Sequence, residues 1–210
     1  MVVNNADLID IKNKLKHINV DLVSLNSYEN RDHNLQNIKG FIMSRIPTEL
    51  SESHGKNISD LCPFSIAEDS RQNHCAHYVS HMMGYELPGA TCKNFTWDDR
   101  QREENGATLR VDDVFKSSPE TDAWADKPAT VKECLIFVTL SSNVRNFGGK
   151  LQMGNHPRKH IGIFTNGEVW HYSNTNNRVV CHSLEHFKNT FRSVYATSGS
   201  TVEFYYGRFL

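Results

Sequence analysis

Cys75 and His160 are the two residues whose types and surroundings best fit a nucleophile and its base. A thiol attacks an amide carbonyl when a nearby imidazole takes its proton, and a further group must orient that imidazole. The segment from Ser70 to Gly84 predicts a helix, with Ser70 or Asn73 as its cap and Gly84 at its end. Cys75 then lies in the first turn, where the helix dipole favours a thiolate and its own N–H can serve as an oxyanion donor.

The candidate base lies on a predicted hairpin. Asn166-Gly167 is a strong two-residue turn signal between two apolar segments, 160–165 and 168–172. In the register of that turn residue 165 pairs with residue 168, so His160 and His171 fall on one face as diagonal neighbours. Such neighbours are about 7–8 Å apart at the backbone, which brings one imidazole within reach of the other.

His171 is therefore the first candidate for the residue that orients His160. Ser173 lies opposite His160 in the same register and is a second candidate. Asn174 projects to the other face and is a weaker one, and His74, directly before the nucleophile, is an accessory candidate. Gly162, between the two histidines, leaves room for their rings.

A metal site has to be weighed, because His77 and His81 are spaced i, i+4 and lie beside His74 and Cys75. There is no Glu next to His77 to act as a hydrolytic base, and there is no paired CxxC motif elsewhere. The three histidines are expected to be solvated or at the rim of the site. The sequence therefore predicts a reaction that needs neither a metal nor a cofactor.

The five cysteines form an odd number without the spacing of a disulfide scaffold, so at least one thiol should be free. Cys134 lies in an apolar run and is expected in the core. Cys62, Cys92 and Cys181 show no pattern.

Length and composition indicate one soluble domain with an added helical segment. The chain has 210 residues, 38% of them hydrophobic, and a formal net charge of -1. A nearly balanced charge argues against a nucleic-acid partner, and no apolar run approaches the roughly 20 residues of a membrane span. No signal peptide is visible at the N-terminus, so synthesis in the cytoplasm is expected.

Apolar spacing predicts helices over about residues 7–18 and 35–46, which form a helical N-terminal segment (1–61) packed on the main domain (62–210). Residues 90–130 are polar and are expected to form long loops with one short helix. Residues 134–140 and 202–209 each predict a strand.

Taken together, these segments resemble the NlpC family of papain-like cell-wall peptidases. That family has a Cys at a helix start, a later buried strand, a His that opens a His-x-Gly-Ile strand, and a polar residue, often His, in the next strand. The matching residues are His74-Cys75-Ala76, Cys134 to Val138, His160-Ile161-Gly162-Ile163 and His171, and the resemblance covers about residues 70–210. Here His74 stands where the family usually has Asp, and Ala76-His77 stands where it has Ser-Gly.

The resemblance implies an α+β, papain-like fold, with an antiparallel sheet packed against the helix whose N-terminus bears Cys75. It also implies a cysteine peptidase or amidase that hydrolyses amide bonds in peptidoglycan stem peptides. Small amidases of this kind without a signal peptide act as antibacterial toxins delivered by type VI secretion. The expected partners are then the peptidoglycan peptide, a component of the secretion apparatus and an immunity protein, and the expected place of action of the monomeric toxin is the periplasm of a target cell.

Two alternatives stay open. The segment Asn73-His74-Cys75-Ala76-His77 also resembles the Asn-Cys-Glu-His-Phe segment of lecithin:retinol acyltransferase-like proteins, which act on lipid esters. In those proteins the His precedes the Cys in the chain, whereas here Cys75 comes first. The other alternative is a non-catalytic binding module on the same fold.

Overall fold

The structure, a computed structural model, describes residues 49–210, and its centre is a six-stranded sheet of order β1-β8-β2-β5-β6-β7. Every neighbouring pair of these strands is antiparallel. The strands are β1 (Thr121–Ala123), β2 (Cys134–Leu140), β5 (Lys159–Thr165), β6 (Glu168–Ser173), β7 (Arg178–Ser183) and β8 (Val202–Gly207), and β3 (Val144–Phe147) and β4 (Lys150–Met153) form a separate hairpin.

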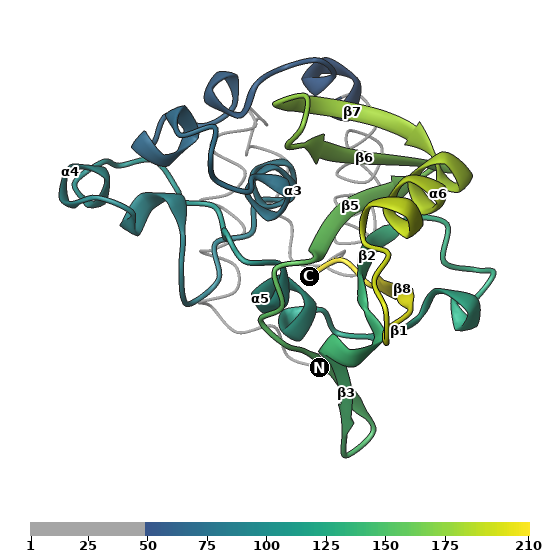
Figure 1. Ribbon diagram of the computed structural model, residues 1–210. Coiled ribbons are helices and arrows are strands. Elements are labelled where there is room, and N and C mark those ends of the chain that lie inside the picture. Colours follow the sequence, from purple (N-terminus) through teal and green to yellow (C-terminus); the bar gives the residue numbers. More distant parts are fainter. Residues whose placement is uncertain (1–48) are drawn as a thin grey trace, which may run out of the picture. The chain divides into compact units, whose positions relative to one another are not determined.

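Helices cover both faces of this sheet (Figure 1). Residues 49–53 are helical, and the later α-helices are α3 (Cys75–Met83), α4 (Trp97–Arg100), α5 (Val111–Ser117) and α6 (Leu184–Val194). Short 3-10 helices are η2 (Ile58–Asp60), η3 (Ser65–Glu68), η4 (Cys92–Asn94), η5 (Trp124–Asp126) and η6 (Ser141–Asn143). The chain is thus of the α+β class with an antiparallel sheet, as the sequence predicts.

The core is divided between the two faces because side chains alternate along β2. Leu135 and Phe137 pack with α3 and α5, whereas Ile136 and Val138 pack with Phe187 of α6. All seven residues of β2 are buried, because β2 lies between β8 and β5 and is covered on both faces. The predictions of strands at residues 134–140 and 202–209 are confirmed, with β8 ending at Gly207.

The predicted hairpin is also confirmed. Thr165 pairs with Glu168, and the pairing continues to Ile163 with Trp170. Asn166 and Gly167 have φ of 52° and 85°, as a type I′ turn requires.

The prediction for residues 90–130 is wrong in part. These residues contain α4 and α5 as well as β1, and Val114 and Phe115 of α5 are buried in the core. The apolar residues of α5 are few and close together, so the sequence pattern of this short helix is weak. Helix α6 and strand β7 were not expected either.

The two helices expected in the first 46 residues lie outside the described residues. Leu50 and Ile58 are part of the core of the unit that contains the sheet. Residues 49–61 therefore pack with the main domain.

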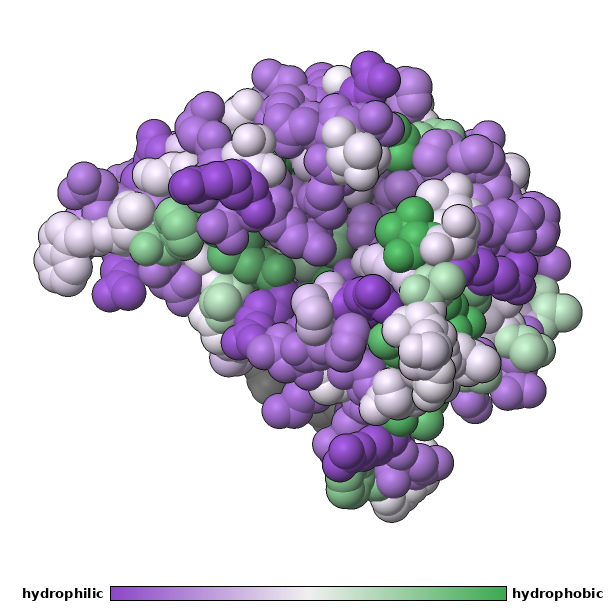
Figure 2. All heavy atoms as spheres, viewed as in Figure 1, coloured by the Kyte–Doolittle hydropathy of each residue, from purple (hydrophilic) through white to green (hydrophobic). Residues whose placement is uncertain are grey.

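Among the described helices, none has the length and apolar character needed to cross a membrane. The face of the molecule in Figure 2 is mostly hydrophilic, and its hydrophobic atoms appear in small groups. Trp97, 73% exposed, and Val194, 63% exposed, are the most exposed of the large hydrophobic side chains described.

We expect Gly162→Ala to destabilise the fold by about 1–3 kcal/mol, because a Cβ there would lie 2.7 Å from Val169 Cγ1 and 3.1 Å from Trp170 O. Gly167→Ala, in the turn of the same hairpin, meets no atom within 4 Å and should cost only the strain of its positive φ, about 1 kcal/mol. Urea unfolding of both variants measures the difference. Equal costs would contradict the close packing at Gly162.

Candidate active site

The candidate site lies where β5 and β6 separate. Both strands continue past Ile163 and Trp170, but their pairing stops there, so residues 159–162 and 171–173 are not paired as strands. Figure 1 shows the two strands diverging, with α3 beside the gap between them. The start of α3 can therefore approach the sheet at the level of the strands.

Two asparagines hold the start of α3 at this gap. Asn174, just after β6, accepts a hydrogen bond from the backbone N–H of His74 at 2.9 Å through its Oδ1. Its Nδ2 donates to Asn73 Oδ1 at 2.9 Å, and the same oxygen accepts from the backbone N–H of Cys75 at 3.1 Å. Asn73 thus satisfies one of the free N–H groups of the helix start, as predicted, although the N-cap residue is His74. Gly84 ends the helix with φ 67°, also as predicted.

The Cys75 thiol faces the peptide unit between His160 and Ile161, and it is only 1% exposed. Burial raises its pKa to about 12, although the backbone N–H groups of Ile161, Ala76 and Cys75 itself act in the opposite direction. The expectation that the helix start makes this group a thiolate is therefore wrong for this state. The loss of hydration outweighs the stabilisation by the N–H groups.

His160 and His171 lie within hydrogen-bond distance of each other, as expected, although the pairing of β5 with β6 stops at Ile163 and Trp170 and does not place Ser173 opposite His160. The Nε2 of His160 lies 3.0 Å from the Nδ1 of His171, and the two rings are nearly perpendicular, at 83°. Burial lowers the pKa of His160 to about 3, so this imidazole is neutral at ordinary pH. Nε2 is therefore engaged, and the ring itself packs against Phe187 and Phe191 of α6. No hydrogen bond between Cys75 Sγ and His160 is present among the described residues, and catalytic contacts often tighten only when substrate binds.

A third histidine extends this pair towards the surface. The Nε2 of His171 lies 3.1 Å from the Nδ1 of His182, a half-buried residue of β7. The ring of His182 lies 4.3 Å, centre to centre, from that of the exposed His186 on α6. Burial, followed by the nearby His160 and His182, holds the pKa of His171 well below its ordinary range. The sequence analysis did not single out His182, whose place follows from the β6–β7 pairing of Val169 with His182.

The other orienting candidates do not contact His160. The Oγ of Ser173 accepts from the backbone N–H of Asn176, and Asn174 bonds to the start of α3 instead. His74 turns away from the thiol: its Nδ1 lies 3.1 Å from His77 Nδ1, and its Nε2 lies 3.1 Å from the carbonyl oxygen of Asp69.

The oxyanion donor expected at Cys75 N–H is also occupied, because that group donates to Asn73 Oδ1. It can bind a substrate oxygen only if this bond is exchanged.

The histidines expected at the rim of the site are buried instead. His74 is 1% exposed and His77 is fully buried, and His81 is half-buried. His74 is the N-cap of α3, and His77 and His81 lie one turn apart on the helix, where they meet Cys62 and Cys92. All five cysteines are free thiols, and Cys134 is in the core as predicted.

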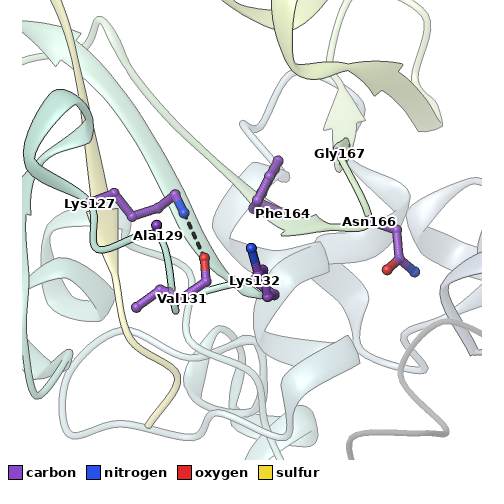
Figure 3. A pocket seen from close by; sticks show the side chains of 7 residues that line it. All are labelled: Lys127, Ala129, Val131, Lys132, Phe164, Asn166 and Gly167. Atoms are coloured by element: carbon purple, nitrogen blue, oxygen red, sulfur yellow. Dashed lines mark hydrogen bonds between the residues drawn. The ribbon is translucent and has the colours of Figure 1, made fainter.

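A separate hollow lies at the other end of β5 from His160. It has a volume of about 480 Å³ and is lined by Lys127, Lys132 and Phe164, among others, with the Asn166-Gly167 turn at its edge (Figure 3). Lys127 points its Nζ to the carbonyl oxygen of Val131, which it reaches at 2.6 Å. None of the histidines of the candidate site lines it.

No protein family, curated protein or solved structure matches this chain.

We expect the buried histidines to make the fold sensitive to mild acid. The unfolded chain binds a proton at His160 once the pH falls below about 6.5, whereas the folded chain does so only near pH 3. The free energy of unfolding is therefore highest above about pH 6.5. As the pH drops from there towards about 3, each such histidine lowers it by up to about 1.4 kcal/mol per pH unit.

Urea unfolding of the wild type and of His160→Gln between about pH 7.5 and about pH 4 tests this, because that range spans the titration of a histidine in the unfolded chain. The variant should show the shallower dependence. Parallel curves for the two proteins would mean that His160 takes up its proton equally in both states.

Proposed function

We propose that this protein is a cysteine hydrolase of amide bonds, with Cys75 as nucleophile and His160 as general base. The contact between His160 Nε2 and His171 Nδ1 carries this proposal. It engages Nε2 of His160, so Nδ1 is the nitrogen available to accept a proton. Cys75 lies on the neighbouring helix start, against the peptide unit that follows His160. Cys75, His160 and His171 are the nucleophile, base and orienting group that such a reaction needs.

The histidine row supports one proton arrangement in which His160 acts as the base. If His160 donates from Nε2 to His171 Nδ1, then His171 donates from its own Nε2 to His182 Nδ1. Neutral imidazole carries one N–H, so Nδ1 of His160 then presents a lone pair. His171 and His182 act as positioning residues in this arrangement.

The reaction then runs in two halves. As Sγ of Cys75 forms a bond to the amide carbonyl carbon, its proton passes to Nδ1 of His160. The carbon–nitrogen bond breaks, and His160 returns that proton to the leaving amine, which gives a thioester on Cys75. Water then attacks the thioester, with His160 again taking and returning the proton, and a carboxylic acid and the free thiol are released.

For the substrate we propose peptide stems of peptidoglycan, on the strength of the likeness to NlpC-type peptidases at Cys75, His160 and His171. The same likeness supports a papain-like arrangement of α3 on the sheet, delivery to the periplasm of a target cell by type VI secretion, and neutralisation by an immunity protein. These proposals share one requirement, a nucleophile that a peptide can reach.

Access to that nucleophile requires a rearrangement. Cys75 is 1% exposed and His160 is 3% exposed. On the α6 side, the ring of Phe191 lies 4.4 Å from that of His160, and Tyr195 packs on Phe191 at 5.2 Å. A substrate that reaches His160 from this side must displace Phe191.

We expect Cys75→Ala and His160→Ala each to lower the release of stem peptides from purified sacculi by at least about a thousandfold, with the fold retained. His171→Ala should lower it by about a hundredfold or more, because the base loses its orientation. Mass spectrometry of the soluble fragments measures the activity, and circular dichroism checks the fold.

Cys181→Ala and His186→Ala are the matched controls and should keep wild-type activity, since neither residue touches Cys75, His160 or His171 through a hydrogen bond in the described chain. Digestion of sacculi by Cys75→Ala would rule out the proposed nucleophile. Phospholipid vesicles are the second substrate in the assay: cleavage of lipid esters with intact sacculi would favour the acyltransferase-like alternative, and no product from either would favour a binding module.

A further inference from the structure

Four potential metal ligands meet at one point beside α3, away from the candidate active site. They are Cys62, just after η2, His77 and His81, one turn apart on α3, and Cys92, at the start of η4. One ligand atom of each lies within 4.8 Å of those of the other three. We propose that Cys62, His77, His81 and Cys92 bind a structural Zn²⁺ ion.

The spacing of the ligand atoms fits a tetrahedral ion. Zinc bound at about 2.3 Å from sulfur and about 2.0–2.1 Å from nitrogen holds its ligand atoms about 3.3–3.8 Å apart. Here His77 Nε2 lies 3.2 Å from Cys62 Sγ and 3.2 Å from His81 Nε2, and His81 Nε2 lies 3.8 Å from Cys92 Sγ. Two sulfurs and two imidazole nitrogens are a set that tetrahedral zinc prefers.

A chain of hydrogen bonds fixes the protonation of His77 for this role. The carbonyl oxygen of Asp69 can only accept, so His74 must donate to it from Nε2, and the Nδ1 of neutral His74 is then an acceptor. His77 must therefore donate from its own Nδ1, across 3.1 Å, and its Nε2 presents a lone pair to the cluster. Such an outer partner, which orients a ligand histidine, is a regular feature of metal sites.

Both sulfurs also accept hydrogen bonds from the backbone, which suits thiolate ligands. The N–H of Ala107 donates to Cys92 Sγ at 3.0 Å, and that of Phe64 faces Cys62 Sγ. Three of the four ligands are buried and His81 is half-buried. Because the protein supplies all four ligands, the ion has no open position for a substrate, and its role is structural.

The metal would tie three segments together: the turn after η2, the middle of α3, and the start of η4. Helix α3 has only nine residues, and its first residue is Cys75. A cross-link at His77 and His81 therefore fixes the helix that carries the candidate nucleophile. The sequence pattern does not indicate this site, because one cysteine precedes the histidine pair and the other follows it, so they form no CxxC motif.

The test is the zinc content of the reduced full-length protein, purified without a polyhistidine tag, incubated with zinc sulfate and desalted. We expect one zinc ion per chain by mass spectrometry of the metal. X-ray absorption should show two sulfur ligands at about 2.3 Å and two nitrogen ligands at about 2.0–2.1 Å. A wild-type protein without bound zinc, or with zinc bound by oxygen atoms, would overturn the proposal whether or not any variant folds.

Ligand variants locate the ion. Cys62→Ser and Cys92→Ser should each lose most of the zinc, whereas Cys181→Ser, a half-buried cysteine outside the cluster, should keep it. Chelation should lower the melting temperature of the wild type, and added zinc should restore it. Full zinc content in both ligand variants would contradict the site. Zinc content is independent of sacculus cleavage, so each proposal can fail alone.

Discussion

The hydrogen bonds between the start of α3 and the residue after β6 hold the candidate nucleophile against the sheet. Asn174 accepts from the N–H of His74 and donates to Asn73, which in turn accepts from the N–H of Cys75. These bonds satisfy two N–H groups that the helix leaves without internal partners. They also place Cys75 at the point where β5 and β6 part, which is where the N–H of Ile161 is free to face its sulfur.

The same helix connects the two sites. Its first residue, Cys75, faces the sheet, and His77 and His81, one turn apart, face Cys62 and Cys92. A rigid helix transmits any displacement along its whole length, so the position of the nucleophile depends on both ends of α3. Two amide side chains hold one end, and the proposed metal ion would hold the rest.

Local patterns in the sequence predicted the parts of the fold that depend on local geometry. The Asn166-Gly167 turn and the two-residue period of the strands were enough to bring His160 to His171, and Gly84 marked the end of α3. The features that were missed depend on contacts between distant segments. The place of His182 follows from the register across the β6–β7 loop, and the burial that raises the pKa of Cys75 exists only in the assembled structure.

The proposed metal site was missed for the same reason. His77 and His81 were considered as ligands, but Cys62 and Cys92 reach them only because the chain folds back over α3. The spacing of these four residues in the sequence does not predict that the chain folds back over α3.

The histidine row and the thiol come from distant parts of the chain. His160, His171 and His182 all lie on β5, β6 and β7, three consecutive strands joined by short turns, and such local pairing needs little loop closure. Cys75 belongs to a segment far earlier in the chain and joins them only through long-range packing. Without that long-range packing the row of imidazoles has no sulfur beside it, so the proposed chemistry depends on completion of the whole fold.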